Sequence, residues 1–121
     1  MNILSTTSRV VTAQERREDA VLDVVDFIRR DGMALYDLLS VLGDEEGADA
    51  LAELVGLCAA PLPARSAVMA EMAEVALSLN MLSFREIDAL ATSGRATFDV
   101  YNAVRWSGAR VADLCARLAA T

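Results

Sequence analysis

The stretch "TAQERREDAVLDVVDFIRRDG", residues 12–32, decides the fold class, because it carries the signals of one amphipathic helix. Thr12 and Glu15 have the spacing of a capping box, in which the two side chains satisfy main-chain N–H groups at a helix start. Apolar residues then recur at helical spacing: Val21, Val24, Val25 and Ile28, with Leu22 and Phe27 widening the face. Arg29 and Arg30 would lie in the last turn, where the helix dipole favours cations. Gly32 predicts the end of this helix.

Similar signals continue along the chain and predict an all-α protein. A short, well-buried helix is expected over 33–42, with Gly43 as its stop, and a third begins in "DEEGAD" (44–49). The turn "APLPAR" (60–65) separates the third and fourth helices, and Pro63 is expected in the first turn of the fourth. A second capping box, "SFRE" (83–86), begins the fifth. A sixth runs over 95–106, and "SG" (107–108) separates it from a seventh.

The expected architecture is therefore a compact bundle of six to seven short helices in a single domain. Its 121 residues suit one domain, and 55% are hydrophobic, which is enough for a core. Residues 1–11 are expected to form a loose N-terminal tail, and residues 12–121 the helical domain. The halves 12–60 and 64–121 would meet at the "PLP" turn, and each is too small to be independently stable.

The charge distribution disfavours nucleic acid as a partner. The net charge is −7, and all of it lies in residues 1–60, which hold twelve acidic residues and five Arg. Residues 61–121 hold six of each and are neutral. An acidic protein repels phosphate at long range, so the net charge disfavours DNA binding.

The residue types present leave little basis for catalysis. His and Lys are absent, which removes the usual general base, the commonest metal ligand and any Schiff base. No glycine-rich phosphate loop occurs. The acidic run 44–49 lacks the ligand spacing of a calcium loop, and we expect Asp44 to cap the third helix instead. We expect no catalytic, cofactor-binding or metal-binding residues, no cofactor, and no enzymatic activity.

One segment has some features of a helix-turn-helix. "SFREIDALATSGRATFDVYNAV" (83–104) places apolar residues near the motif's spacing and would expose Arg95, Asn102 and Arg105 on the second helix. Asp88 stands where a small apolar residue is normal, and Asp99 would bring a negative charge towards DNA. Ordinary packing within the bundle is the favoured interpretation, and DNA reading by 83–105 is the alternative.

The last helix offers a second kind of contact. Val104, Val111 and Leu118 fall seven residues apart, with Leu114 between the last two. Val111, Leu114 and Leu118 therefore predict a short helix-pairing seam that could join two copies. Trp106, beside the expected break, is the best candidate for an exposed aromatic anchor.

The function predicted from these features is a small cytoplasmic, non-enzymatic protein-interaction module: a regulator, adaptor or inhibitor acting through a helical surface. Its expected partner is a protein, with a homodimer as one form, DNA disfavoured and no membrane. The N-terminus lacks a signal-peptide pattern, and no apolar stretch has membrane-spanning length. Cys58 and Cys115 lie in apolar helical patterns and are expected to be buried free thiols, although a bridge between them is left open.

Overall fold

The structure, a computed structural model, describes residues 12–82 and 98–121, which form four helices and contain no strand. They are α2 (Ala13–Val41), α3 (Glu45–Leu57), α4 (Arg65–Met81) and α6 (Phe98–Ala120). The all-α fold is confirmed. The number of helices is lower than predicted, because two pairs of expected short helices are each one long helix. The helix expected to begin at Ser83 and the tail 1–11 lie outside the described residues.

The first long helix, α2, passes through Gly32 without a break. Thr12 caps it as predicted, accepting a hydrogen bond from the main-chain N–H of Glu15 at 3.1 Å. Gly32 is buried, and a Cβ there would lie 3.2 Å from Cγ2 of Ile28 and 3.6 Å from Cγ2 of Val55 in α3. The distance to Ile28, in the same helix, is tight, whereas the distance to Val55 is an ordinary van der Waals contact, so α3 packs beside Gly32 without interrupting α2. Tertiary packing outweighs the helix propensity lost at one glycine, about 1 kcal/mol.

The second long helix, α6, likewise continues through Ser107 and Gly108. The side chain of Ser107 is buried, in line with the apolar residues of the core-facing stripe: Val104, Val111, Leu114 and Leu118. Since this row repeats every three or four residues without interruption, burial of the whole row favours one helix over two. The predicted break at "SG" is wrong.

The turns at the ends of α3 follow the sequence signals more closely. Gly43 has φ of +79°, a left-handed conformation that suits glycine, and it separates α2 from α3. Asp44 caps α3 as expected, since Oδ1 accepts a hydrogen bond from the N–H of Gly47 at 3.0 Å. The chain then runs through the Pro61 turn to α4. Pro63 lies just before that helix and not in its first turn, contrary to prediction.

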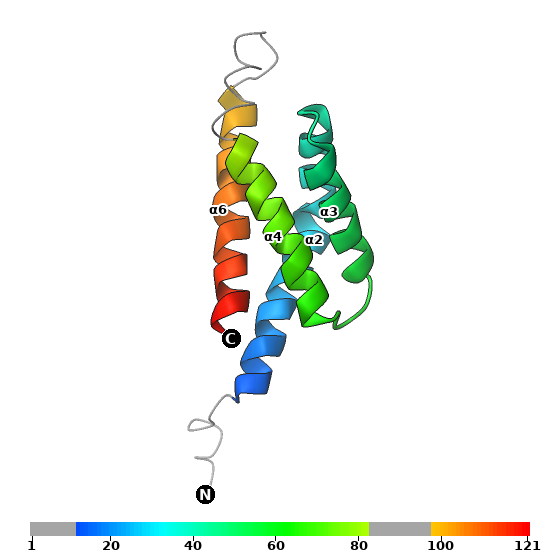
Figure 1. The fold of residues 1–121 in the computed structure, drawn as a ribbon, viewed down its shortest axis with the longest axis vertical. Coiled ribbons are helices and arrows are strands. Elements are labelled where there is room, and N and C mark those ends of the chain that lie inside the picture. The colour runs from blue at the N-terminus through cyan, green and yellow to red at the C-terminus, as the bar shows by residue number, and fades with distance from the viewer. Residues whose placement is uncertain (1–11, 83–97) are drawn as a thin grey trace, which may run out of the picture.

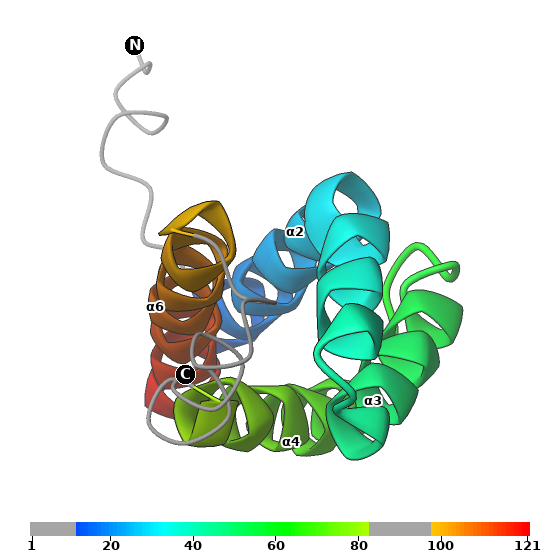
Figure 2. The same ribbon diagram turned by 90° about the horizontal axis from the view of Figure 1, so that it is seen from above.

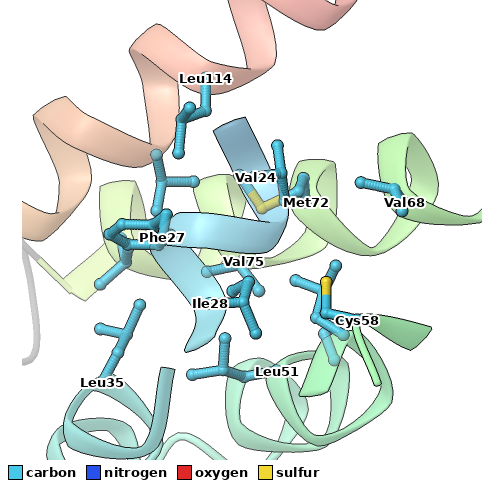
Figure 3. Close-up of a cluster of buried hydrophobic side chains, with 14 of the residues drawn as sticks. Val24, Phe27, Ile28, Leu35, Leu51, Cys58, Val68, Met72, Val75 and Leu114 are labelled. Atoms are coloured by element: carbon cyan, nitrogen blue, oxygen red, sulfur yellow. The ribbon is translucent and has the colours of Figure 1, made fainter. Parts of the chain in front are cut away.

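The four helices surround one core, to which each contributes (Figures 1 and 2). α3 and α6 each pack against both α2 and α4. Figure 3 shows the centre of the core, where Phe27 and Ile28 of α2 meet side chains of the other three helices: Leu51, Met72, Val75 and Leu114. A core shared in this way makes the described residues a single domain. None of their helices has the length and apolar character that crossing a membrane requires.

Candidate interaction groove

A groove of about 700 Å³ lies between the second half of α2 and the first half of α6. The two helices are close where α6 ends and diverge towards its beginning, as both ribbon views show (Figures 1 and 2). The groove lies in the divergent part. We call it the α2–α6 groove.

Most of the α2 wall is a regular helical row, to which Leu35 and Asp37 are added. Phe27, Asp31, Ala34, Leu38 and Val41 all line the groove, at intervals of four, three, four and three residues. Phe27 is buried and forms part of the floor, whereas the side chain of Val41 is 76% exposed at the far end. This wall therefore runs from the core of the domain out to its surface.

The wall on α6 contains two of the residues predicted to contact a partner. Asn102 and Trp106 line the groove together with Val100, Ala103 and Ser107. The side chain of Trp106 is 59% exposed, so most of the indole faces solvent. The structure thus places the predicted aromatic anchor beside a hollow that a partner could fill.

The other two predicted contact residues do not line the groove. Arg105, next to Trp106, is exposed on α6 but is absent from the groove wall. Arg95 lies outside the described residues, as does most of the segment compared with a helix-turn-helix. The structure therefore brings Asn102 and Trp106 together at one site.

The predicted dimer seam is occupied by the chain itself. Val111, Leu114 and Leu118 are at most 1% exposed and belong to the core, where α6 packs on α2 and α4. Their heptad-like spacing is real, but it pairs α6 with helices of the same chain. A dimer seam through these three residues is therefore wrong, because side chains buried in this core cannot also meet a second copy.

Polar contacts at the opposite end of α6 join it to α2 and to α4. Arg117 of α6 forms an ion pair with Asp23 of α2. Arg65, in the first turn of α4, donates a hydrogen bond from Nη2 to the carbonyl oxygen of Leu118. These contacts fix the closed end and leave the divergent end uncovered by the other described helices.

The groove is acidic on one side only. Asp31 and Asp37 lie on its α2 wall, whereas the described side chains of the α6 wall carry no charge. Asp31 pairs with Arg30 at 3.8 Å, and both side chains are well exposed, so this ion pair is weak. Within the described residues, no ion pair involves Asp37. The α2 edge of the groove therefore favours a cationic ligand.

Neither thiol supplies a nucleophile to this surface. Cys58 and Cys115 are both free, which answers the question of a bridge between them. Burial raises the pKa of the Cys58 thiol, although nearby Arg29 lowers it in part, and burial also raises the pKa of Cys115. Both thiols therefore stay protonated at neutral pH. Among residues 12–82 and 98–121, no cluster of acidic or cysteine side chains could hold a metal ion.

Sequence reasoning missed the α2 wall. A helix stop at Gly32 predicts that Ala34, Leu38 and Val41 belong to a separate, well-buried helix. Val41 and Met33 are in fact among the most exposed large apolar side chains of the described chain. If the helix is continued through Gly32, the row from Phe27 to Val41 becomes visible in the sequence alone.

Comparison with protein families, curated proteins and solved structures finds no match to this chain.

Proposed function

We propose that this chain is a small cytoplasmic, non-enzymatic interaction module that binds a segment of a partner protein in the α2–α6 groove. The observation that carries the proposal is the exposure of Trp106 and Val41 on opposite walls of one hollow. Exposed aromatic residues beside a cavity are typical binding hot spots. The two free cysteines suit a reducing compartment.

A protein segment suits the groove better than a small molecule does. Small-molecule sites bury most of the ligand and of their own lining. Here Val41 on the α2 wall and Trp106 on the α6 wall remain more than half exposed. The groove also extends along α2 to the surface of the protein. A partner large enough to cover both edges would remove this apolar surface from water, at about 25 cal/mol per Å².

The chemistry of the described residues supports a binding role over catalysis. The chain has no His or Lys, and both thiols are held protonated by burial. The two carboxylates on the described groove lining, Asp31 and Asp37, both lie on α2, so no described acidic group faces them from α6.

DNA reading by 83–105 is not our proposal. Asn102 and Trp106 open onto a groove edged by Asp31 and Asp37, which would repel phosphate. The distinguishing measurement is fluorescence anisotropy of labelled duplex DNA across a salt series. The DNA-binding alternative predicts binding that weakens steeply with salt and is lost in Arg95→Ala. We expect not to observe binding with these two properties.

The test of the proposed function is a peptide-display selection on the purified chain, followed by comparison of two matched variants. Val41→Asp places a charge in the groove wall. Met33→Asp places the same charge at an equally exposed position of α2 that does not line the groove, since Met33 is 61% exposed. Both positions are surface positions, so both variants should keep the helical circular dichroism spectrum of the parent.

We expect the selected peptides to bind the parent and Met33→Asp equally and to lose at least tenfold in affinity for Val41→Asp. Enrichment of peptides that bind all three proteins equally would show that binding occurs elsewhere. A folded chain that enriches no peptide, or a turnover abolished by one carboxylate substitution, would also overturn the proposal.

A further inference from the structure

We infer that the segment bound in the α2–α6 groove is an amphipathic α-helix with basic side chains along the edge that faces α2. This inference deepens the proposed function and rests on it. Spacing, backbone chemistry, groove dimensions and charge lead to it independently.

The spacing of the wall residues fits a third helix. On α2, the row from Phe27 to Val41 has alternating intervals of four and three residues. On α6, Val100, Ala103 and Ser107 have the same kind of spacing, with intervals of three and four residues. Rows of this kind form the ridges and holes into which side chains of another helix insert. A groove between two such rows, which no other described helix of the chain covers, has the form of a position for a further helix in a bundle.

Backbone chemistry disfavours an extended peptide. An extended segment normally binds by adding hydrogen bonds to an exposed sheet edge. The walls of this groove are helices, whose main-chain groups are already paired internally along their length. A helical segment satisfies its own N–H and C=O groups and needs only side-chain contacts from the groove.

The dimensions of the groove set the length and the apolar residues of the segment. The α2 wall from Phe27 to Val41 is about 21 Å long, at about 1.5 Å per helical residue, which corresponds to about two heptads of a bound helix. Ala34 and Ala103, one on each wall, leave room for a large apolar side chain between them. The exposed indole of Trp106 would pack against the side of this anchor.

The charge of the groove determines which edge of the bound helix carries basic residues. The acidic residues in the described lining of the groove, Asp31 and Asp37, are both on α2. The surrounding half of the chain, residues 1–60, carries the whole net charge of −7. A bound helix would therefore be favoured with Arg or Lys along its α2-facing edge and neutral residues towards Asn102. The existing pair between Arg30 and Asp31 is exposed and weak, so a cation of the partner can compete with it.

The experiment uses three synthetic peptides of two heptads each and the fluorescence of Trp106, the single tryptophan of the chain. The first peptide has Leu at positions spaced by three and four, with Arg along one edge. The second has the same composition in scrambled order. The third carries Glu in place of Arg. Circular dichroism of the complexes reports whether the peptide becomes helical.

Two double variants test the charge. Asp31→Asn with Asp37→Asn neutralises the groove edge. Asp49→Asn with Glu53→Gln makes the same change in charge on the exposed surface of α3, outside the groove. We expect the first peptide to change Trp106 emission and gain helicity, and the other two to bind at least tenfold more weakly. The groove-edge variant should weaken binding by roughly threefold to tenfold and reduce its salt dependence, while the α3 variant should not.

The inference fails, with the proposed function intact, if peptides selected on the groove bind without becoming helical. It also fails if the scrambled or Glu-bearing peptide binds as well as the first. If the first peptide binds the groove-edge variant and the α3 variant equally, the acidic residues of the groove do not contribute to binding, and the inference is overturned. A change of Trp106 emission on dilution of the protein alone would identify a second copy as the occupant. If neither designed nor selected peptides perturb Trp106, and Val41→Asp is without effect, the proposed function fails as well.

Discussion

Arg29, in the middle of α2, donates two hydrogen bonds to the carbonyl oxygen of Cys58, at the C-terminal end of α3, from Nε at 3.2 Å and from Nη2 at 3.1 Å. The carbonyl groups in the last turn of a helix lack partners within it and carry the negative end of the helix dipole. A cation from α2 therefore completes the end of α3. The sequence had placed Arg29 at the end of its own helix, and the structure places it at the end of another.

Loss of this contact should weaken the packing of α3 on α2. We expect Arg29→Ala to lower the free energy of unfolding by about 1–2 kcal/mol, since hydrogen bonds from a charged donor are lost and the carbonyl is left unpaired. Arg30→Ala is the matched control, because Arg30 makes only a long, exposed ion pair; its effect should stay below about 0.5 kcal/mol. Urea denaturation followed by circular dichroism measures both, and equal effects would remove the capping role of Arg29.

The continuity of α6 can be tested at Gly108. A Cβ there would lie 3.8 Å from Cβ of Leu79, an ordinary contact, and the residue is inside a helix. Gly108→Ala should therefore raise the free energy of unfolding by up to about 1 kcal/mol. Gly43→Ala should lower it by about 1 kcal/mol or more, because Gly43 has φ of +79°. If Gly108→Ala destabilises the fold as Gly43→Ala does, the chain turns at "SG" and α6 is not one helix.

Because the predicted dimer seam is buried in the core of one chain, we expect the free energy of unfolding to depend on Leu114 and not on protein concentration. Leu114 is 1% exposed in the core, so Leu114→Ala should cost about 2–5 kcal/mol. Denaturation midpoints measured over a hundredfold range of protein concentration should coincide for the parent and the variant. A midpoint that rises with concentration in the parent alone would support the dimer seam that the structure contradicts.

The buried thiols predict a specific alkaline sensitivity. A thiol whose pKa is raised by folding contributes stability fully below its ordinary pKa, here about 9, and loses it as pH rises through the raised value. Unfolding should therefore become easier above about pH 9. In the double variant Cys58→Ala with Cys115→Ala, this part of the decline should be absent. Urea titrations of both proteins between neutral pH and pH 10 make the comparison, and parallel pH profiles would contradict it.

Much of the fold could be predicted from local signals, and the two wrongly predicted helix breaks share one cause. The caps at Thr12 and Asp44 and the stop at Gly43 depend on a few neighbouring residues, and the structure confirms all three. Gly32 and the pair Ser107–Gly108 were read as stops by the same local logic. Both lie inside long helices because the core residues before and after them pack against α3 and α4, which are distant in sequence.

Because a helix stop was predicted at Gly32, the α2 wall of the groove could not be predicted from the sequence. Trp106 could be selected from the sequence because a single tryptophan beside small residues is conspicuous. Its counterpart Val41 could not, because a helix divided at Gly32 does not show the row that links it to Phe27. Which apolar rows face the core and which remain open depends on how the helices diverge. That is a tertiary property, absent from the periodicity of any one helix.

The central claim is that the α2–α6 groove is uncovered in the free protein, and the most direct test is quenching of Trp106 fluorescence by acrylamide. The account predicts quenching close to that of a free tryptophan analogue, unchanged on dilution and strongly reduced when a groove-binding peptide is added. A tryptophan already shielded in the free protein would contradict the account, since it would mean that the chain itself or a second copy fills the groove.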